Sequence, residues 1–153
     1  YVTLGEYDFH HTRDCFRGNC AHKPVEMEVL FVKKHPLYRT KNFVSHDVCL
    51  VRLLSNVQFT DYIQPICLPS TLETDEKNLY NKTMTIAGWG TMENHPQTVL
   101  PHVLQELDVV VKPSGVCDSI ELDWESQICA AGTGPAKSPC PGDSGGPLMY
   151  YNT

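Results

Sequence analysis

The chain has 153 residues, of which 41% are apolar and 20% charged, and its formal net charge is −6. This length suits about one domain, and the composition is that of a globular protein and not of a disordered one. The acidic balance and the lack of a basic run in the sequence exclude nucleic acid as a main partner. Every apolar run is too short to span a membrane, so we expect no membrane partner.

Short strands separated by turns dominate the predicted secondary structure. Residues 25–32 alternate apolar and polar side chains, which predicts a half-buried strand, and residues 48–54 are apolar at almost every position, which predicts a strand covered on both faces. Two more strands are predicted over residues 84–87 and 107–111. The best helical window, 112–120, contains Pro113 and Gly115 and therefore predicts two helical turns at most. Together these patterns indicate an all-β sandwich or barrel.

A charged stretch over residues 71–78 lies between two strand-rich halves of the chain. Charge runs of this kind are usually solvated, so we expect a surface loop; the alternative is an acidic binding site.

Seven cysteines and the sequon at Asn81 indicate an oxidising, secretory environment. The first residues form no signal peptide, so we expect a secreted, extracellular protein whose targeting segment lies outside this chain, with Asn81 as the glycosylation site. The odd number of cysteines leaves at least one that is free or has its partner elsewhere.

The most informative segment is residues 140–148, Cys-Pro-Gly-Asp-Ser-Gly-Gly-Pro-Leu, in which Ser144 stands among three glycines. Glycines permit close approach of another carbonyl and let backbone N–H groups converge on one point. A serine becomes a nucleophile only with a base, an orienting carboxylate and donors for the oxyanion. The alternative, the serine elbow of α/β-hydrolases, needs a strand before and a helix after the serine, and the prolines here exclude both.

Together with other segments of the chain, this one resembles the catalytic domain of chymotrypsin-like, trypsin-family serine proteases. The resemblance rests on segments that occur in the family's order, namely Leu4-Gly5-Glu6, His35-Pro36-Leu37-Tyr38, residues 47–53, residues 64–69, Gly88-Trp89-Gly90, residues 127–130 and residues 142–148. It implies two antiparallel six-stranded β-barrels, both incomplete: residues 1–60 belong to the first barrel, 61–80 link the barrels, and 81–153 belong to the second. Within the family, the chain is similar to the clip-domain proteases of arthropods in two features: the closely spaced Cys15 and Cys20, and the sequence of residues 64–69.

The resemblance also implies roles for individual residues. Ser144 matches the nucleophile, and Asp47 matches the carboxylate that orients the catalytic histidine. The N–H groups of Gly142 and Ser144 match the oxyanion hole, and Asp143 matches the carboxylate that pairs with a new amino terminus after zymogen activation. Ser138, six residues before Ser144, matches the floor of the primary substrate pocket, which would then be small and neutral and would favour apolar over cationic side chains.

The catalytic histidine is where the chain departs from the family pattern. No histidine before Asp47 has the Ala-Ala-His-Cys context of the family, and His46 merely adjoins the aspartate. We therefore expect the chain to be an internal fragment that has no peptidase activity by itself. The alternative is a non-catalytic homologue that acts as a binding or scaffold protein.

Two cysteine pairs are expected to be disulfides. Cys117 and Cys129 resemble a family pair, and Cys15 and Cys20 are close enough in sequence to pair locally. The alternative for the second pair is a zinc site with His22, which would need a fourth ligand.

The remaining cysteines are expected to lie outside these pairs. Cys67 and Cys140 resemble cysteines whose partners belong to other segments, and Cys49 is expected to be a buried free thiol.

The expected function is that of a secreted serine endopeptidase, a zymogen in an immune-type proteolytic cascade. The implied partners are protein substrates, an upstream activating protease and serpin-type inhibitors. No cofactor is required. The resemblance allows a calcium ion in a loop that contains Glu6, Asp8 and Asp14, and the alternative is a solvated acidic loop.

Overall fold

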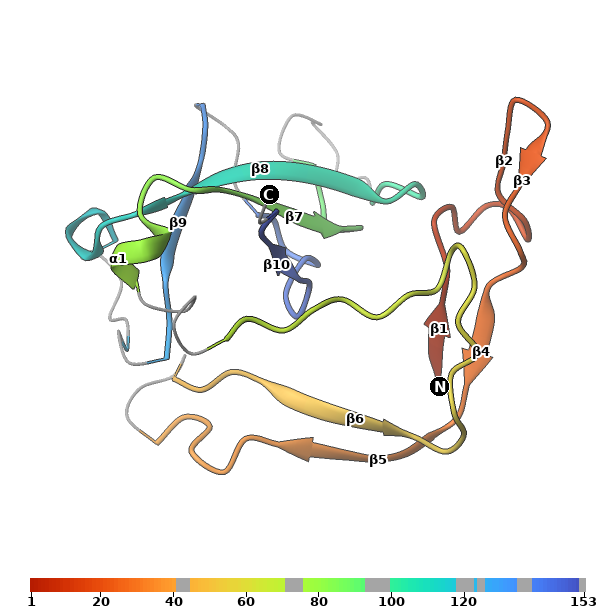
Figure 1. Cartoon of the computed structure of the whole chain (residues 1–153), viewed down its shortest axis with the longest axis horizontal. Helices are drawn as coiled ribbons and strands as arrows, with labels where there is room; N and C mark the ends of the chain where they lie inside the picture. Colours follow the sequence, from red (N-terminus) through yellow and green to blue (C-terminus); the bar gives the residue numbers. More distant parts are fainter. Residues whose placement is uncertain are drawn as a thin grey trace. The chain divides into compact units, whose positions relative to one another are not determined.

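The computed structural model describes residues 1–40, 45–70, 76–92, 100–117, 123, 126–134 and 139–151. Their contacts define two units: Tyr1–His35 with Val48–Leu68, and Pro36–Asp47 with Pro69–Thr153. The second unit includes Pro36–Asp47, and the expected division into barrels at residues 1–60, 61–80 and 81–153 stays a prediction. Each unit is described by itself below (Figure 1).

The first unit consists of paired strands. β1 (Val2–Leu4) pairs antiparallel with β4 (Val25–Met27), β2 (Cys15–Phe16) with β3 (Asn19–Cys20), and β5 (Val29–Lys34) with β6 (Cys49–Leu53). Figure 1 shows β5 and β6 running side by side. The register shifts between Val29 and Phe31, so a bulge bends β5 near its start.

The predicted strand over residues 25–32 is therefore two strands, β4 and β5, divided at Glu28. The Glu28 carbonyl accepts a hydrogen bond from Leu54 N at 2.8 Å, which holds the chain where it passes from one pairing to the other. Strand β6 was expected to be covered on both faces, and that expectation is wrong for this structure because Leu50 is 70% exposed. An apolar sequence makes burial favourable, but only a packed neighbour buries the side chain.

The second unit is built on a four-stranded antiparallel sheet in the order β10-β7-β8-β9. The strands are β7 (Thr83–Gly88), β8 (Gln105–Lys112), β9 (Cys129–Gly132) and β10 (Leu148–Met149). The two predicted segments 84–87 and 107–111 are the centres of β7 and β8, which pair over six positions and lie side by side in Figure 1. Short apolar runs bounded by Gly88 and by Pro113 are a local signal, so the sequence sufficed to find them.

The core of the second unit lies against this sheet. Met84, Val109 and Val111 are buried there, and the side chains packed on them include those of Leu79 and Ile86. Leu79 ends α1 (Glu76–Leu79), a single helical turn that overlaps the end of residues 71–78, where the sequence predicted a surface loop. Packing of Leu79 against the core stabilises this turn, and the pattern of charges in the sequence carries no information about that contact.

Helical structure is scarce in the described residues. It consists of α1 and of the 3₁₀ turn η1 (Ser114–Val116), which falls in the window where at most two helical turns were predicted. No helix in the described ranges has the length and the apolar composition that crossing a bilayer requires. The chain is thus nearly all-β, and within the described residues neither group of strands closes into a barrel.

Candidate active site

The segment around Ser144 forms two consecutive turns just before β10. Asp143 N donates to Cys140 O at 3.0 Å, and Gly146 N donates to Asp143 O at 2.9 Å. Gly142 and Gly145 have φ values of +106° and +86°, a region in which side chains are strained and glycine is at ease. The glycines thus permit a backbone that leaves the Ser144 side chain exposed.

The N–H groups next to the Ser144 hydroxyl are available as donors. Among the described residues, neither Gly142 N nor Ser144 N has a hydrogen-bond partner. Two unengaged N–H groups beside a serine are the elements from which an oxyanion hole is made. The geometry is compatible with acyl transfer at Ser144.

The Asp143 carboxylate is held in a backbone cradle. Its Oδ1 accepts from Gly90 N at 2.8 Å, and its Oδ2 accepts from Cys140 N at 3.0 Å. A side chain at Gly88 or Gly90 would overlap this carboxylate, and a side chain at Gly142 would come within 3.0 Å of Gly90 Cα. The glycines of the Gly88-Trp89-Gly90 segment, which the sequence analysis used only for the resemblance, are therefore explained by sterics, because they leave room for the Asp143 side chain.

An open cavity of about 650 Å³ borders Ser144. Its walls come from β7, β9, β10 and the turns before Ser144, and most of the lining side chains are apolar. The lining residues are Ile86, Ile128, Ala130, Pro139, Cys140, Pro141, Asp143, Ser144, Gly146, Pro147 and Leu148. Such a surface suits an apolar group more than a charged one.

Asp47 lies in the same unit as Ser144, at the end of the segment Pro36–Asp47. Its side chain is exposed. The backbone just before it is fixed, because Ser45 is fully buried and its carbonyl accepts from Arg39 N at 3.0 Å. The carboxylate is therefore carried by an anchored segment, not by a free loop.

A second acid–histidine contact adjoins Asp47, and sequence reasoning missed it. His46 Nδ1 lies 3.7 Å from Asp123 Oδ2, with the two side chains 18% and 6% exposed. His46 adopts a φ of +53°, uncommon for a residue with a side chain. The sequence held no signal for this contact, since Asp123 is remote from His46 in the chain.

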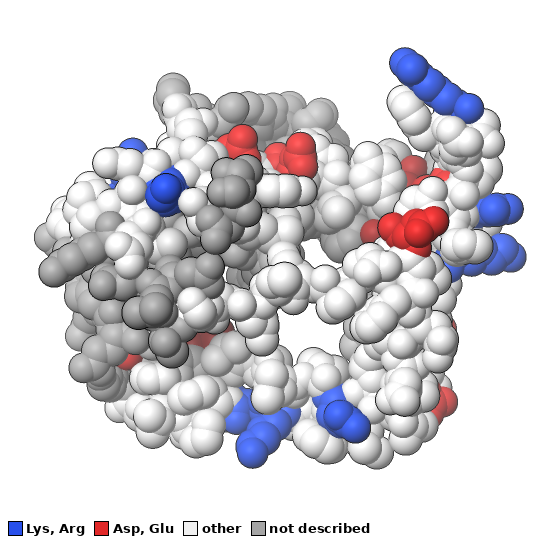
Figure 2. Space-filling model, viewed as in Figure 1, with Lys and Arg blue, Asp and Glu red and all other residues white. Residues whose placement is uncertain are grey.

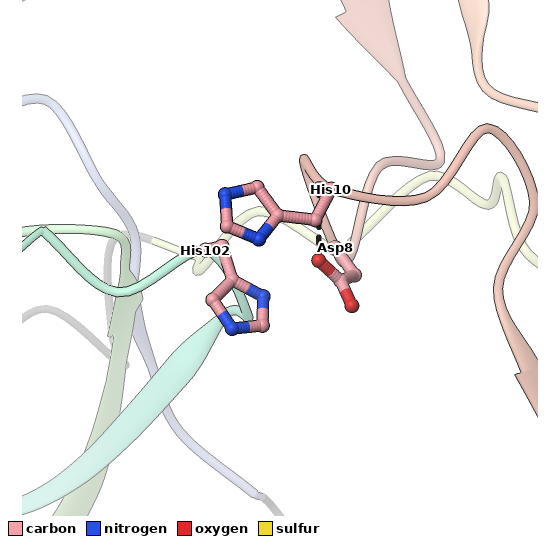
Figure 3. A group of neighbouring side chains, drawn as sticks. All are labelled: Asp8, His10 and His102. Atoms are coloured by element: carbon pink, nitrogen blue, oxygen red, sulfur yellow. Dashed lines mark hydrogen bonds between the residues drawn. The ribbon is translucent and has the colours of Figure 1, made fainter.

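The acidic loop of the first unit does not gather its carboxylates. Asp8 Oδ1 accepts from His10 N at 2.9 Å, as Figure 3 shows, and His11 Nδ1 lies 2.7 Å from Asp8 Oδ2. Glu6 accepts from the neighbouring N–H of the chain, and within the described residues Glu6, Asp8 and Asp14 form no group with ligand atoms within 4.8 Å of one another. As placed, these acids do not fit a calcium ion, and calcium binding by them stays a prediction.

Two disulfides are present, Cys15–Cys20 and Cys117–Cys129. They are the two pairs that the sequence led us to expect, and the first leaves no thiolates for the alternative zinc site. Cys67 is a free, exposed thiol. Cys140 belongs to neither disulfide.

Cys49 was expected to be a buried thiol, and this is a correction: it is exposed, because β6 has no layer over it among the described residues.

The last two predicted site residues differ in what the structure says about them. Ser138 lies outside the described residues, so its role at the pocket floor stays a prediction. Asn81 is exposed in a tight turn before β7, with a φ of +60°. An exposed turn is accessible to a glycosylating enzyme.

Figure 2 shows small separate groups of acidic and basic side chains on one face of the molecule, with uncharged surface between them. The exposed uncharged surface includes apolar side chains such as Leu50, Leu68 and Phe59.

Comparison with known proteins identifies the class. The family model described as Trypsin matches residues 5–153. The chain belongs to the trypsin family of serine proteases, and its fold is the chymotrypsin-like fold.

Relatives within this family include insect clip-domain serine proteases. In an alignment 172 positions long, the chain is 37% identical to a phenoloxidase-activating enzyme of Bombyx mori, and the alignment covers 99% of this chain and 38% of the relative. It matches the crystal structure of the Drosophila Grass clip serine protease of the Toll pathway with a TM-score of 0.74 and 32% identity, covering 95% of this chain and 42% of that one. Neuropsin, a mouse serine protease, gives a TM-score of 0.71 at 26% identity, covering 97% of this chain and 60% of that one. The chain thus spans about two fifths of the clip-domain relatives.

Proposed function

We propose that the natural protein containing these residues is a serine endopeptidase that hydrolyses peptide bonds through an acyl-enzyme on Ser144. The observation that carries the proposal is the geometry of the Ser144 loop. The hydroxyl is exposed, and the N–H groups of Gly142 and Ser144 have no partner among the described residues. Membership in the trypsin family supports the same reaction class.

In the proposed reaction, Ser144 Oγ attacks the scissile carbonyl carbon and its proton passes to a histidine base. The oxyanion accepts hydrogen bonds from Gly142 N and Ser144 N. The C–N bond then breaks, the base returns the proton to the leaving amine, and water hydrolyses the acyl ester by the same steps. Asp47 orients the base and stabilises its charged form.

The base is the one part that this chain does not supply in a recognisable motif. We infer that it is a histidine outside these residues in the natural protein. Asp47 stands on an anchored backbone next to buried Ser45, which suits a carboxylate whose task is to hold another side chain in place.

Asp143 is proposed to control activation. Each of its oxygens already accepts one backbone N–H, from Gly90 and from Cys140. A carboxylate has about four acceptor positions, so an ammonium group released by proteolysis can bind in addition. Because Asp143 lies between Gly142 and Ser144, a contact at its side chain acts directly on both oxyanion donors.

We place the natural protein in an extracellular cascade, as a secreted zymogen of the clip-domain type. Relatives bear the names of phenoloxidase-activating enzymes and of a Toll-pathway protease. Its partners would be protein substrates, an activating protease and serpin-type inhibitors. The two disulfides and the exposed sequon at Asn81 suit an oxidising compartment.

A fluorophosphonate probe tests the proposal on the activated natural protein. We expect covalent labelling at Ser144, found by peptide mapping, and none in the Ser144→Ala variant. Ser55→Ala, at an exposed serine of the first unit, is the matched control and should label like the wild type. A folded, activated protein whose Ser144 stays unlabelled would contradict the proposal and indicate a non-catalytic homologue that acts by binding.

A further inference from the structure

The residue before the proposed catalytic carboxylate is engaged in a partly buried contact of its own. His46 Nδ1 faces Asp123 Oδ2 at 3.7 Å. We propose that His46 is a positioning residue, which holds Asp47 in place by its contact with Asp123. This inference rests on the proposed function, since it concerns the orientation of Asp47 in that reaction.

Asp123 is a firm anchor. Its Oδ2 also accepts from Ser126 Oγ at 2.8 Å, and its backbone N donates to Gln127 Oε1 at 2.8 Å. The loop that carries it is closed by the Cys117–Cys129 disulfide, and Cys129 is only 1% exposed. Asp123 is thus held at its carboxylate by Ser126 and at its backbone N by Gln127, so a side chain that packs against it meets a fixed group.

The distance of 3.7 Å between His46 Nδ1 and Asp123 Oδ2 is that of an acid–histidine pair and is too long for a direct hydrogen bond, so the contact acts by charge and packing. The Asp123 side chain is 6% exposed, and a carboxylate at such a site needs donors around it. The Ser126 hydroxyl is such a donor, and the imidazole of His46, 18% exposed, lies on the same oxygen at the longer distance of an acid–histidine pair. Removing the imidazole would leave the carboxylate with fewer compensating groups and free the chain at position 46.

The backbone links this contact to Asp47. His46 has a φ of +53°, a conformation that few residues adopt without a specific reason. On its other side, Ser45 is fully buried and its carbonyl accepts from Arg39 N. Since the dihedral angles of His46 set the direction in which the chain enters Asp47, a contact that holds the His46 side chain also restrains the Asp47 carboxylate.

Three substitutions at position 46 separate the side-chain contact from the backbone conformation. His46→Asn keeps an N–H donor near the Nδ1 position, and asparagine tolerates positive φ. His46→Gly tolerates the backbone but loses the contact, and His46→Ala loses both. The control is His102→Ala, at an exposed histidine of the same unit.

The assay is peptide hydrolysis by the activated natural protein, with kcat normalised to the active sites titrated by a fluorophosphonate. Loss of folded protein lowers the titrated fraction, whereas misplacement of Asp47 lowers kcat per titrated site. For His46→Gly and His46→Ala we expect kcat to fall by roughly 10- to 100-fold, the range that misplacement of a catalytic group produces, with KM unchanged. His46→Asn and His102→Ala should stay close to the wild type.

A double-mutant cycle with Asp123 completes the test. Asp123→Ala should lower kcat as His46→Gly does, and the two changes together should cost no more than either alone. Ser126→Ala, which loosens Asp123 without removing its charge, is the gentler variant and should lower kcat in the same direction.

The inference is overturned if His46→Gly keeps the wild-type kcat per titrated site, if His46→Asn is as impaired as His46→Gly, or if the losses at positions 46 and 123 add. A wild-type protein that does not label at Ser144 overturns the proposed function, and the positioning role falls with it.

Discussion

The cradle of Asp143 leads to a quantitative prediction for Gly90→Ala. Gly90 is buried, and a Cβ atom there would lie 2.5 Å from the Asp143 Cγ and 2.7 Å from its Oδ2. Ordinary carbon contacts are 3.5–4.0 Å, so the carboxylate must move by roughly 1 Å. That displacement breaks the 2.8 Å hydrogen bond from Gly90 N and strains the 3.0 Å bond from Cys140 N.

The expected cost follows from these two bonds. A hydrogen bond to a charged group contributes about 1.5–3 kcal/mol, and Asp143 is partly exposed, so water replaces part of what is lost. We therefore expect Gly90→Ala to lower the free energy of unfolding by about 2 kcal/mol. For a domain of this size the midpoint of thermal unfolding then falls by about 4–8 °C.

The assay is thermal unfolding of the natural protein, followed by circular dichroism, with fluorophosphonate labelling of Ser144 as a second readout. Gly134→Ala is the matched control, because a Cβ there meets no atom within 4 Å. Labelling of Gly90→Ala should slow, since the displaced Asp143 carries the donors Gly142 and Ser144 with it. A midpoint shift no larger than that of Gly134→Ala would show that the carboxylate adapts without cost, and the reasoning would be refuted.

Three further predictions concern the core, the specificity and the metal. Val109→Ala removes a fully buried side chain and should cost about 2 kcal/mol in urea unfolding, whereas Val116→Ala, at a residue that is 59% exposed, should have little effect; equal losses would contradict the placement of the core. The activated natural protein should prefer apolar residues at the cleaved position of a peptide library, and Ser138→Asp should move that preference toward Arg and Lys; cleavage mainly after Arg or Lys by the wild type would contradict the role of Ser138. Chelation with EDTA should leave the labelling of Ser144 unchanged, because serine acyl transfer proceeds with a base and N–H donors; a loss that calcium restores would show that the protein depends on a calcium ion.

The sequence predicted the parts of this protein that depend on local patterns. Short apolar runs bounded by glycine or proline located the centres of β7 and β8, which pair antiparallel. The ordered motifs led to the trypsin family, which the family match over residues 5–153 confirms. Ser144 and Asp47 are carried by such motifs, so their candidacy needed no knowledge of the fold.

The same local patterns misled where burial decides the outcome. Residues 48–54 are apolar at almost every position, and the sequence therefore predicted a covered strand with a buried Cys49. In the structure β6 pairs only with β5 among the described residues, and Cys49 is exposed. An apolar pattern shows that burial of a strand would be favourable, but the strand is buried only where other segments pack against it.

By itself, then, the sequence determined the family, the nucleophile motif and the two disulfide pairs, because each depends on residue types at short or family-wide spacing. Only the tertiary structure decided that Gly90 holds Asp143, 53 positions away, and that His46 contacts Asp123. The physical reason is that a hydrogen bond or ion pair requires two groups within a few ångströms. Such proximity between remote residues follows from strand pairing and loop closure, which no short stretch of sequence contains.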